Sequence, residues 1–115
     1  MRQWHVNPSF LCDKHLLGEH VEHHMFCGCL LKNKSLKGYI EKGLVEIHTL
    51  ISRHNELVLE MNKRGMNHQS PLNESLIEPL LKQEGHVNRL ANIKELHSRC
   101  QKCKEKIEKV YFFEE

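Results

Sequence analysis

The sequence predicts an all-α fold: a single compact domain of three main helices, with an extended N-terminal arm packed across them. Two observations support this prediction. Apolar residues recur at three- and four-residue spacing in three separate segments, and no segment shows the alternation typical of a half-buried strand. The chain has 115 residues, which is enough for one hydrophobic core but not for two. We therefore expect one domain over residues 1–115.

The arm is expected over residues 1–12. Asn7 stands before Pro8, which disfavours helix at that point, and the apolar side chains of Trp4 and Phe10 can anchor the arm on the helices. Twelve extended residues reach up to about 40 Å, whereas position 22 lies only about 14 Å along a helix from position 13. The N-terminus can therefore meet the middle of the first helix.

The first helix is expected over residues 13–26, with Asp13 as its cap. A longer helix that continues to Leu31 is the alternative. One stripe recurs at helical spacing and is expected to be buried: Leu17, Val21 and His24, flanked by Leu16 and His20. Glu19 and Glu22 are three residues apart and are therefore neighbours on the helix surface. A carboxylate held on a rigid helix is suited to acid–base chemistry.

A basic, turn-rich loop follows the first helix over residues 32–38. It carries Lys32, Lys34 and Lys37, and Tyr39 comes directly after it. A basic loop with one aromatic residue can contact a phosphate backbone, or it can be a solvated surface loop. Composition alone favours neither interpretation.

The clearest periodic segment runs over residues 44–64, and Gly65 is expected to end that helix as a cap. Its apolar stripe consists of Leu44, Ile47, Leu50, Ile51, His54, Leu57, Val58 and Met61. Arg53, Glu56 and Glu60 are expected on the wetter side of this helix.

A short helical turn is expected over residues 74–81, interrupted by Pro79. The last main helix is expected to start near residues 86–88 and to continue to Val110. Its apolar stripe consists of Val87, Leu90, Ile93, Leu96, Cys100, Cys103, Ile107 and Val110. The aromatic residues 111–113 are expected to pack on the core.

Composition limits the classes of function. The net charge is +2, from 17 basic and 15 acidic residues. This charge permits nucleic-acid binding, but it is much smaller than the strongly basic charge that is typical of nucleic-acid-binding domains. No apolar run is long enough to span a membrane, and because no targeting segment is visible we expect a cytoplasmic protein. The five cysteines are an odd number, which favours free thiols or a metal site over a disulfide framework.

Two sets of side chains are candidate metal ligands, although we expect neither metal nor cofactor. The first is a four-thiolate zinc set made of Cys27, Cys29, Cys100 and Cys103. Cys100 and Cys103 also fit the apolar stripe of the last helix as small core residues. The second set lies on one helix and consists of Glu19, His20, His23 and His24.

Two stretches of the chain resemble a known family. Residues 15–22 read His-Leu-Leu-Gly-Glu-His-Val-Glu, and residues 53–67 end in Lys-Arg-Gly-Met-Asn. Both are similar to motifs of the phage-type endonuclease V family, the pyrimidine-dimer DNA glycosylases with an associated lyase step. The resemblance covers roughly residues 1–68, and the last helix agrees only in general character.

The resemblance implies a particular chemistry. The family's terminal α-amine, here that of Met1, attacks the sugar C1′ of a damaged nucleotide; a Schiff base forms, the base is released, and β-elimination cuts the strand. Glu22 matches the family's catalytic glutamate, which stabilises the cationic sugar and assists proton transfer. An amine attacks only when neutral, and an ordinary α-amine has a pKa of about 7.7–8.0, against about 10.4 for lysine.

The implied partner is double-stranded DNA carrying a damaged or modified base, bound by a monomer. The expected DNA contacts are Arg2, His15, His20, Lys32, Lys34, Lys37 and Arg53. Met1 stands where the family usually has a small residue, and Val21 and Met25 stand where it has arginines, so the base that is recognised stays open. The alternative is a non-catalytic DNA-binding or partner-binding module on the same scaffold, with or without structural zinc.

Overall fold

The computed structural model describes residues 1–68 and 70–110, and all regular structure within them is helical. This confirms the predicted all-α fold. The α-helices are α1 Asp13–Leu31, α2 Lys37–Glu41, α3 Leu50–Lys63, α4 Glu74–Ile77, α5 Arg89–Arg99 and α6 Gln101–Glu108. Three 3-10 helices join them: η1 Pro8–Phe10, η2 Ile47–Thr49 and η3 Glu78–Leu80. Residues 111–113, expected on the core, lie outside the described part of the chain.

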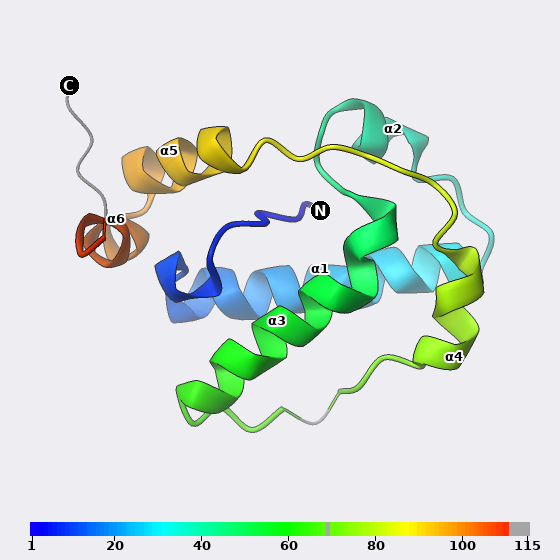
Figure 1. The fold of residues 1–115 in the computed structure, drawn as a ribbon, viewed down its shortest axis with the longest axis horizontal. Coiled ribbons are helices and arrows are strands. Elements are labelled where there is room, and N and C mark those ends of the chain that lie inside the picture. Colours follow the sequence, from blue (N-terminus) through cyan, green and yellow to red (C-terminus); the bar gives the residue numbers. More distant parts are fainter. Residues whose placement is uncertain (69, 111–115) are drawn as a thin grey trace.

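The N-terminal arm runs between α1 and the segment that leads into α5, while α3 crosses α1 (Figure 1). Backbone and side-chain hydrogen bonds fix the arm on both sides. Gln3 N–H donates to the carbonyl oxygen of Leu44 at 2.7 Å, and Asn92 Nδ2 donates to the carbonyl oxygen of Trp4 at 2.7 Å. The predicted packing of the arm across the helices is therefore confirmed.

Two apolar clusters form the core. The first joins the arm to α1, α3, α5 and α6, and consists of Trp4, Val6, Phe10, Leu11, Cys12, Leu16, Leu57, Met61, Leu96, Cys103 and Ile107. The second lies around the C-terminal half of α1 and consists of Phe26, Cys27, Leu30, Leu36, Val45, Ile47, Leu50 and Ile77. Burial of these side chains is the main force that holds the arm and helices together.

The buried face of α1 differs from the predicted stripe. Leu17 and Val21 are 42% and 54% exposed, whereas Glu19 and His23 are buried. The prediction was wrong because hydropathy does not register polar side chains that find partners inside the protein. The cap was also wrong: Cys12 is the residue before the helix, and Asp13 is its first residue.

The helix α3 begins six residues later than predicted. Residues 44–46 instead form hydrogen bonds with the arm and with the segment that precedes α5. Gln3 Oε1 accepts a hydrogen bond from Glu46 N–H at 2.7 Å, and the Glu46 carboxylate accepts one from Val87 N–H at 2.9 Å. At its other end α3 stops as predicted, with Gly65 at a φ of +77° that favours glycine.

The last predicted helix is divided into α5 and α6 at Cys100, whose φ of −129° and ψ of 109° are extended. The break redirects the chain, so that α6 buries Cys103 and Ile107 in the first core cluster. Periodicity did not show the break because both halves keep an apolar stripe.

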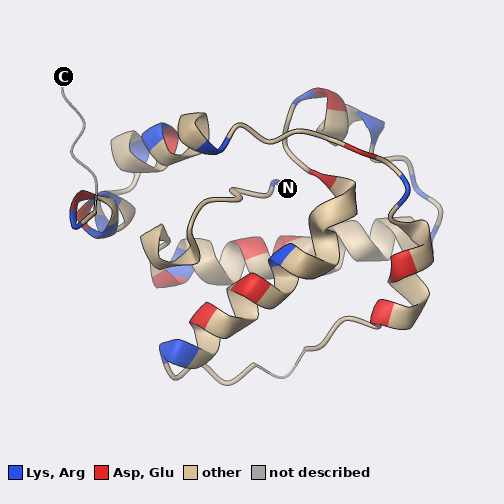
Figure 2. Ribbon diagram, viewed as in Figure 1, with Lys and Arg blue, Asp and Glu red and all other residues tan. Residues whose placement is uncertain are grey.

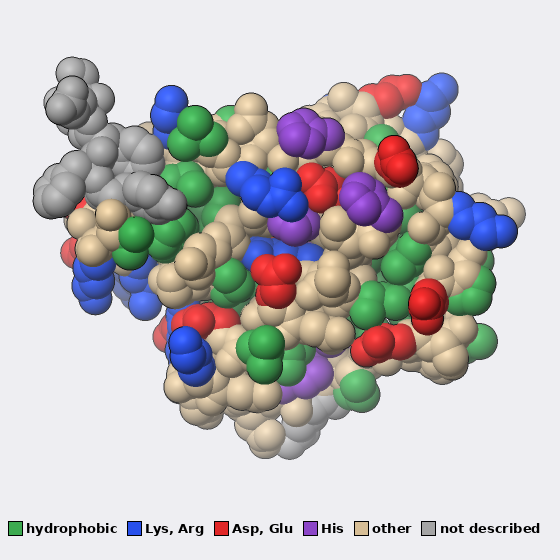
Figure 3. Space-filling view, viewed as in Figure 1, with side chains coloured by type: hydrophobic (Ala, Val, Ile, Leu, Met, Phe, Trp, Pro, Cys, Tyr) green, Lys and Arg blue, Asp and Glu red, His purple; other side chains and the backbone are tan. Residues whose placement is uncertain are grey.

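Charged residues of both signs are distributed along α3 and α5 (Figure 2) and are interspersed on the face of the molecule seen in Figure 3. Among the described residues, no helix combines the length and the apolar composition needed to cross a membrane.

Candidate active site

A hollow of about 240 Å³ opens between the arm, α1 and the end of α5. The residues that line it are Arg2, Trp4, Lys14, His15, Gly18, Glu19, Glu22 and Arg99. Two carboxylates from α1 therefore face the same opening as three cationic side chains, which come from the arm, α1 and α5. The predicted catalytic carboxylate, Glu22, is among them.

The start of the chain is held against Glu22. The backbone N–H of Arg2 donates a hydrogen bond to Glu22 Oε2 at 3.1 Å. The α-amine of Met1 lies one residue beyond, and consecutive Cα atoms are about 3.8 Å apart. The Met1 side chain is half-buried and packs against the second core cluster. The first nitrogen of the chain therefore belongs to the residue directly before the one whose backbone is bound to the carboxylate.

The side chain of Arg2 fastens the arm to α5. Its Nη1 donates to Glu95 Oε2 at 2.9 Å, and its Nη2 donates to Asn92 Oδ1 at 2.7 Å. The guanidinium also lies 3.8 Å from the centre of the Trp4 ring, a cation–π contact. Arg2 is therefore near the site, but its two terminal nitrogens already have protein partners.

A buried network fixes the arm beside α1. Gln3 Oε1 accepts from Glu46 N–H, so Gln3 Nε2 faces His23 and donates to its Nε2 at 2.9 Å. His23 Nδ1 in turn donates to the carbonyl oxygen of Glu19 at 2.8 Å. Burial lowers the pKa of His23 to about 4, so that the ring is neutral at pH 7 and can accept from Gln3.

Arg53 was predicted on the wetter side of α3, and that position is wrong. Its Nε and Nη2 donate to the two Glu19 oxygens at 2.7 and 3.0 Å, and the two side chains are 1% and 0% exposed. Nη1 donates to the carbonyl oxygen of Val6 at 2.7 Å. Arg53 therefore joins α3 to α1 and the arm, and its guanidinium is enclosed rather than exposed for the predicted phosphate contact.

The other predicted DNA contacts fall in three places. His15 lines the hollow and packs edge-on against Trp4, with ring centroids 5.7 Å apart. His20 is buried, and burial together with neighbouring histidines lowers its pKa to about 4, so that it is uncharged at pH 7. The three lysines of the basic loop, Lys32, Lys34 and Lys37, are exposed beyond the C-terminal end of α1. They begin ten residues, or about 15 Å of helix, past Glu22.

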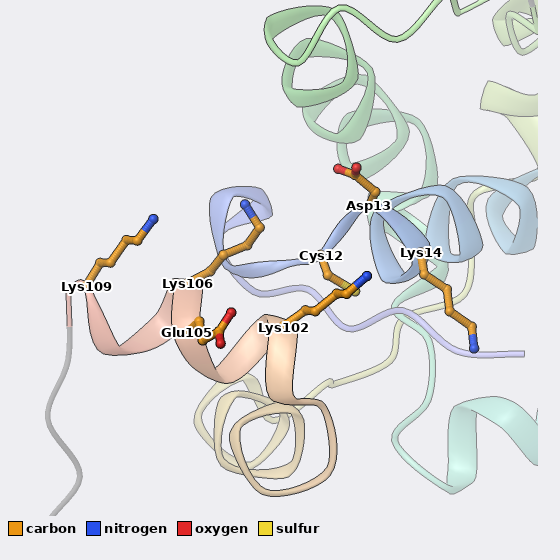
Figure 4. A pocket seen from close by; sticks show the side chains of 7 residues that line it. All are labelled: Cys12, Asp13, Lys14, Lys102, Glu105, Lys106 and Lys109. Carbon is orange, nitrogen blue, oxygen red and sulfur yellow. The ribbon is translucent and has the colours of Figure 1, made fainter.

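Sequence reasoning missed the basic residues at the other end of α1. Arg99 lies 5.4 Å over the Trp4 ring and lines the hollow together with Lys14. Lys14 also borders a second hollow of about 370 Å³ between α1 and α6. Its lining, shown in Figure 4, is Cys12, Asp13, Lys14, Lys102, Glu105, Lys106 and Lys109. The lysines of the last helix were visible in the sequence, but only the tertiary fold brings them beside α1.

The cysteines of the predicted zinc set lie in different parts of the fold. Cys27 packs in the second core cluster, where burial raises the pKa of its thiol to about 11, and Cys29 packs against that cluster. Cys103 belongs to the first core cluster, and Cys100 packs against it. Two groups among the described residues are close enough to hold a metal ion, and neither includes Cys27 or Cys29. The groups are Cys12, His15, Cys100 and Cys103, and His20, His24, His54 and His68.

A family model described as pyrimidine dimer DNA glycosylase matches residues 1–74 of the chain. This segment contains the arm, α1 and α3, and it confirms the resemblance predicted from the two motifs. Neither the search of curated proteins nor the search of solved structures found a match.

Proposed function

Because the chain belongs to the pyrimidine dimer DNA glycosylase family, we propose that it is a DNA glycosylase with an associated abasic-site lyase activity, acting on damaged or modified pyrimidines in double-stranded DNA. The observation that carries the proposal is the hydrogen bond from Arg2 N–H to Glu22 Oε2 at 3.1 Å, which holds the terminus of the chain beside a carboxylate in an open hollow.

In the proposed reaction, the lone pair of the Met1 α-amine forms a bond to the sugar C1′. The bond between C1′ and the base breaks, and its electron pair leaves with the base, which takes up a proton. Loss of the amine proton and opening of the sugar ring give a Schiff base. Removal of a C2′ proton then expels the 3′ phosphate by β-elimination.

Glu22 is proposed to act at two points in this sequence. Its carboxylate stabilises the positive charge that develops on the sugar as the base departs. It also accepts and returns protons at the amine and at C2′, a role typically worth 10²- to 10⁴-fold in rate. Its position on the rigid α1 helix supports this assignment, because α1 holds the carboxylate at a fixed distance from the arm.

The arm is proposed to hold the nucleophile in place. Arg2 and Gln3 are each fixed by side-chain hydrogen bonds, to α5 and to His23 respectively. A terminus held in this way loses little freedom when the sugar arrives, which favours attack. An ordinary α-amine is about one-tenth neutral at pH 7, whereas an ordinary lysine is almost entirely protonated.

The phosphate backbone is proposed to lie along the basic residues around the two hollows. Lys14 borders both hollows, Arg99 lies at the first, and Lys102 and Lys106 lie at the second. Cations spaced along one edge match the repeating charge of a DNA strand. Lys32, Lys34 and Lys37 stay predicted contacts for the far side of the same duplex.

The competing function is DNA binding without catalysis. It is favoured by one observation: Val21 and Met25, which occupy the positions of two family arginines, are 54% and 50% exposed on α1 and bring no charge to it. Borohydride reduction separates the two functions, because it converts a Schiff base into a stable covalent link. We expect trapping on duplexes that carry a pyrimidine dimer, an abasic site or a modified pyrimidine. Salt-sensitive binding to all of them without trapping would support the non-catalytic module.

A further inference from the structure

Three thiols and one imidazole converge where the start of α1 meets the junction of α5 and α6. We propose that Cys12, His15, Cys100 and Cys103 bind a structural zinc ion. Their ligand atoms all lie within 4.8 Å of one another. The inference concerns a site that the proposed glycosylase chemistry does not use.

The distances within the group fit a tetrahedral zinc site. Cys12 Sγ lies 3.8 Å from Cys100 Sγ and 3.2 Å from His15 Nδ1, and Cys103 Sγ lies 3.6 Å from His15 Nδ1. Zinc bonds of about 2.3 Å to sulfur and 2.0–2.1 Å to nitrogen give tetrahedral edges of about 3.8 Å between two sulfurs and about 3.5 Å between sulfur and nitrogen. A disulfide would instead bring two sulfurs to about 2.05 Å.

The local structure presents the ligands in two matching pairs. Cys12 precedes α1 and His15 lies in its first turn; Cys100 precedes α6 and Cys103 lies in its first turn. Each pair is separated by two residues, a spacing common in structural zinc sites. The extended conformation at Cys100 that ends α5 therefore also produces the second pair.

The surroundings suit a site rich in thiolates. The backbone N–H of Cys12 donates to Cys103 Sγ at 3.2 Å, the kind of outer hydrogen bond that orients a metal-bound sulfur. Lys14 and Lys102 border the adjacent hollow together with Cys12, and their positive charge offsets the net negative charge of three thiolates on one Zn²⁺. Cys12 and Cys103 are both buried, which shields the site from water.

A zinc ion at this site would link two segments that are far apart in the sequence. The ion would join residues 12–15 to residues 100–103, which are 88 positions apart. It would hold α6 and its lysines against α1 and fix the ring of His15 at the edge of the candidate active site. Four protein ligands leave no open coordination position, so the role is structural rather than catalytic.

Cobalt titration of the full chain tests this proposal, because only thiolate ligands produce a sulfur-to-cobalt charge-transfer absorption. The probe is Co²⁺ added to metal-free, reduced protein. We expect the band to saturate at one equivalent, to disappear when excess Zn²⁺ is added, and to be unaffected in Cys29→Ser. In Cys100→Ser, whose changed side chain is half-exposed, we expect at least about tenfold weaker binding. The histidine group has no sulfur and cannot give the band.

A second measurement tests the zinc site in wild-type protein, without any substitution. A chelator added to zinc-loaded wild-type protein should lower Tm by at least about 4 °C. Absence of the band in wild-type protein, a band unchanged in Cys100→Ser, or a Cys12–Cys100 disulfide in freshly purified protein would each overturn the zinc site.

Discussion

Arg53 and Glu19 form a bidentate ion pair that joins α3 to α1, and Glu19 also lines the candidate active site. The pair is almost completely enclosed, so each charge depends on the other for compensation. Glu22 lies one turn further along α1, so its position depends on the Arg53–Glu19 ion pair, which takes no part in the proposed reaction.

Arg53→Ala should reduce the free energy of unfolding by about 3–5 kcal/mol, because it leaves the Glu19 charge buried without a partner. Urea denaturation measures this loss. The double variant Glu19→Gln with Arg53→Met should be less destabilised than the sum of its single changes. Lys63→Ala, an exposed change at the end of the same helix, is the control. A loss for Arg53→Ala no larger than that control would contradict the structural role.

Glu22→Gln should reduce the rate of base release by at least about a hundredfold while leaving stability almost unchanged. The amide keeps an oxygen that can accept the Arg2 N–H, but it can neither shuttle protons nor balance the cationic sugar. Single-turnover kinetics on a damaged duplex measure the rate. Glu41→Gln, an exposed change on α2, should retain full activity. Equal rates for Glu22→Gln and wild-type protein would exclude Glu22 as the catalytic carboxylate.

Lys102→Ala combined with Lys106→Ala should weaken binding to every duplex, damaged or intact, and should flatten its dependence on salt. Each lost phosphate contact lowers the slope of log K against log salt by about 1. Fluorescence anisotropy at several salt concentrations measures both effects. Lys63→Ala with Lys82→Ala removes the same charge outside both hollows. If the two double variants behave alike, the proposed path of the backbone is incorrect.

The free energy of unfolding should decrease in acid, partly because the Glu46 carboxylate becomes protonated. Burial alone would raise the pKa of Glu46, but the Val87 N–H and the charges of His5 and Arg89 outweigh it and hold the pKa below the ordinary 4.5. A lowered folded-state pKa gives stability that is present above about pH 4.5 and lost as pH falls through the folded value.

Denaturation of wild-type protein and Glu46→Gln at a series of pH values checks this prediction. The variant should show a shallower loss of stability below about pH 4.5. Glu74→Gln, an exposed change on α4, should follow the wild-type curve. An acid response in Glu46→Gln as steep as that of wild-type protein would show that the Glu46 contacts do not contribute.

Sequence periodicity was sufficient for the helices that bury apolar stripes. The end of α3 at Lys63 follows from a local signal, namely a positive-φ glycine, Gly65, after a basic turn. The reach of the arm allowed the N-terminus to meet the middle of the first helix, and the hydrogen bond from Arg2 N–H to Glu22 agrees with that expectation.

The buried polar pairs could not be predicted in this way. A sequence shows Glu19 and Arg53 as ordinary charged helical residues, and only tertiary contact between α1 and α3 reveals that they are paired. The same holds for Cys12 and Cys103, which are 91 positions apart and meet because α6 turns at Cys100. Hydropathy placed His20 correctly inside but gave no indication that Leu17 and Val21 face outward.

The proposed glycosylase chemistry depends on the α-amine of Met1 as the nucleophile. The most direct test is mass spectrometry of the peptides released after the protein has been trapped by borohydride on a damaged duplex. We predict that the deoxyribose adduct lies on the N-terminal peptide, at the α-amine of Met1, and that two residues added before Met1 prevent trapping. An adduct on a lysine, or undiminished trapping by the extended chain, would show that the α-amine of Met1 is not the nucleophile.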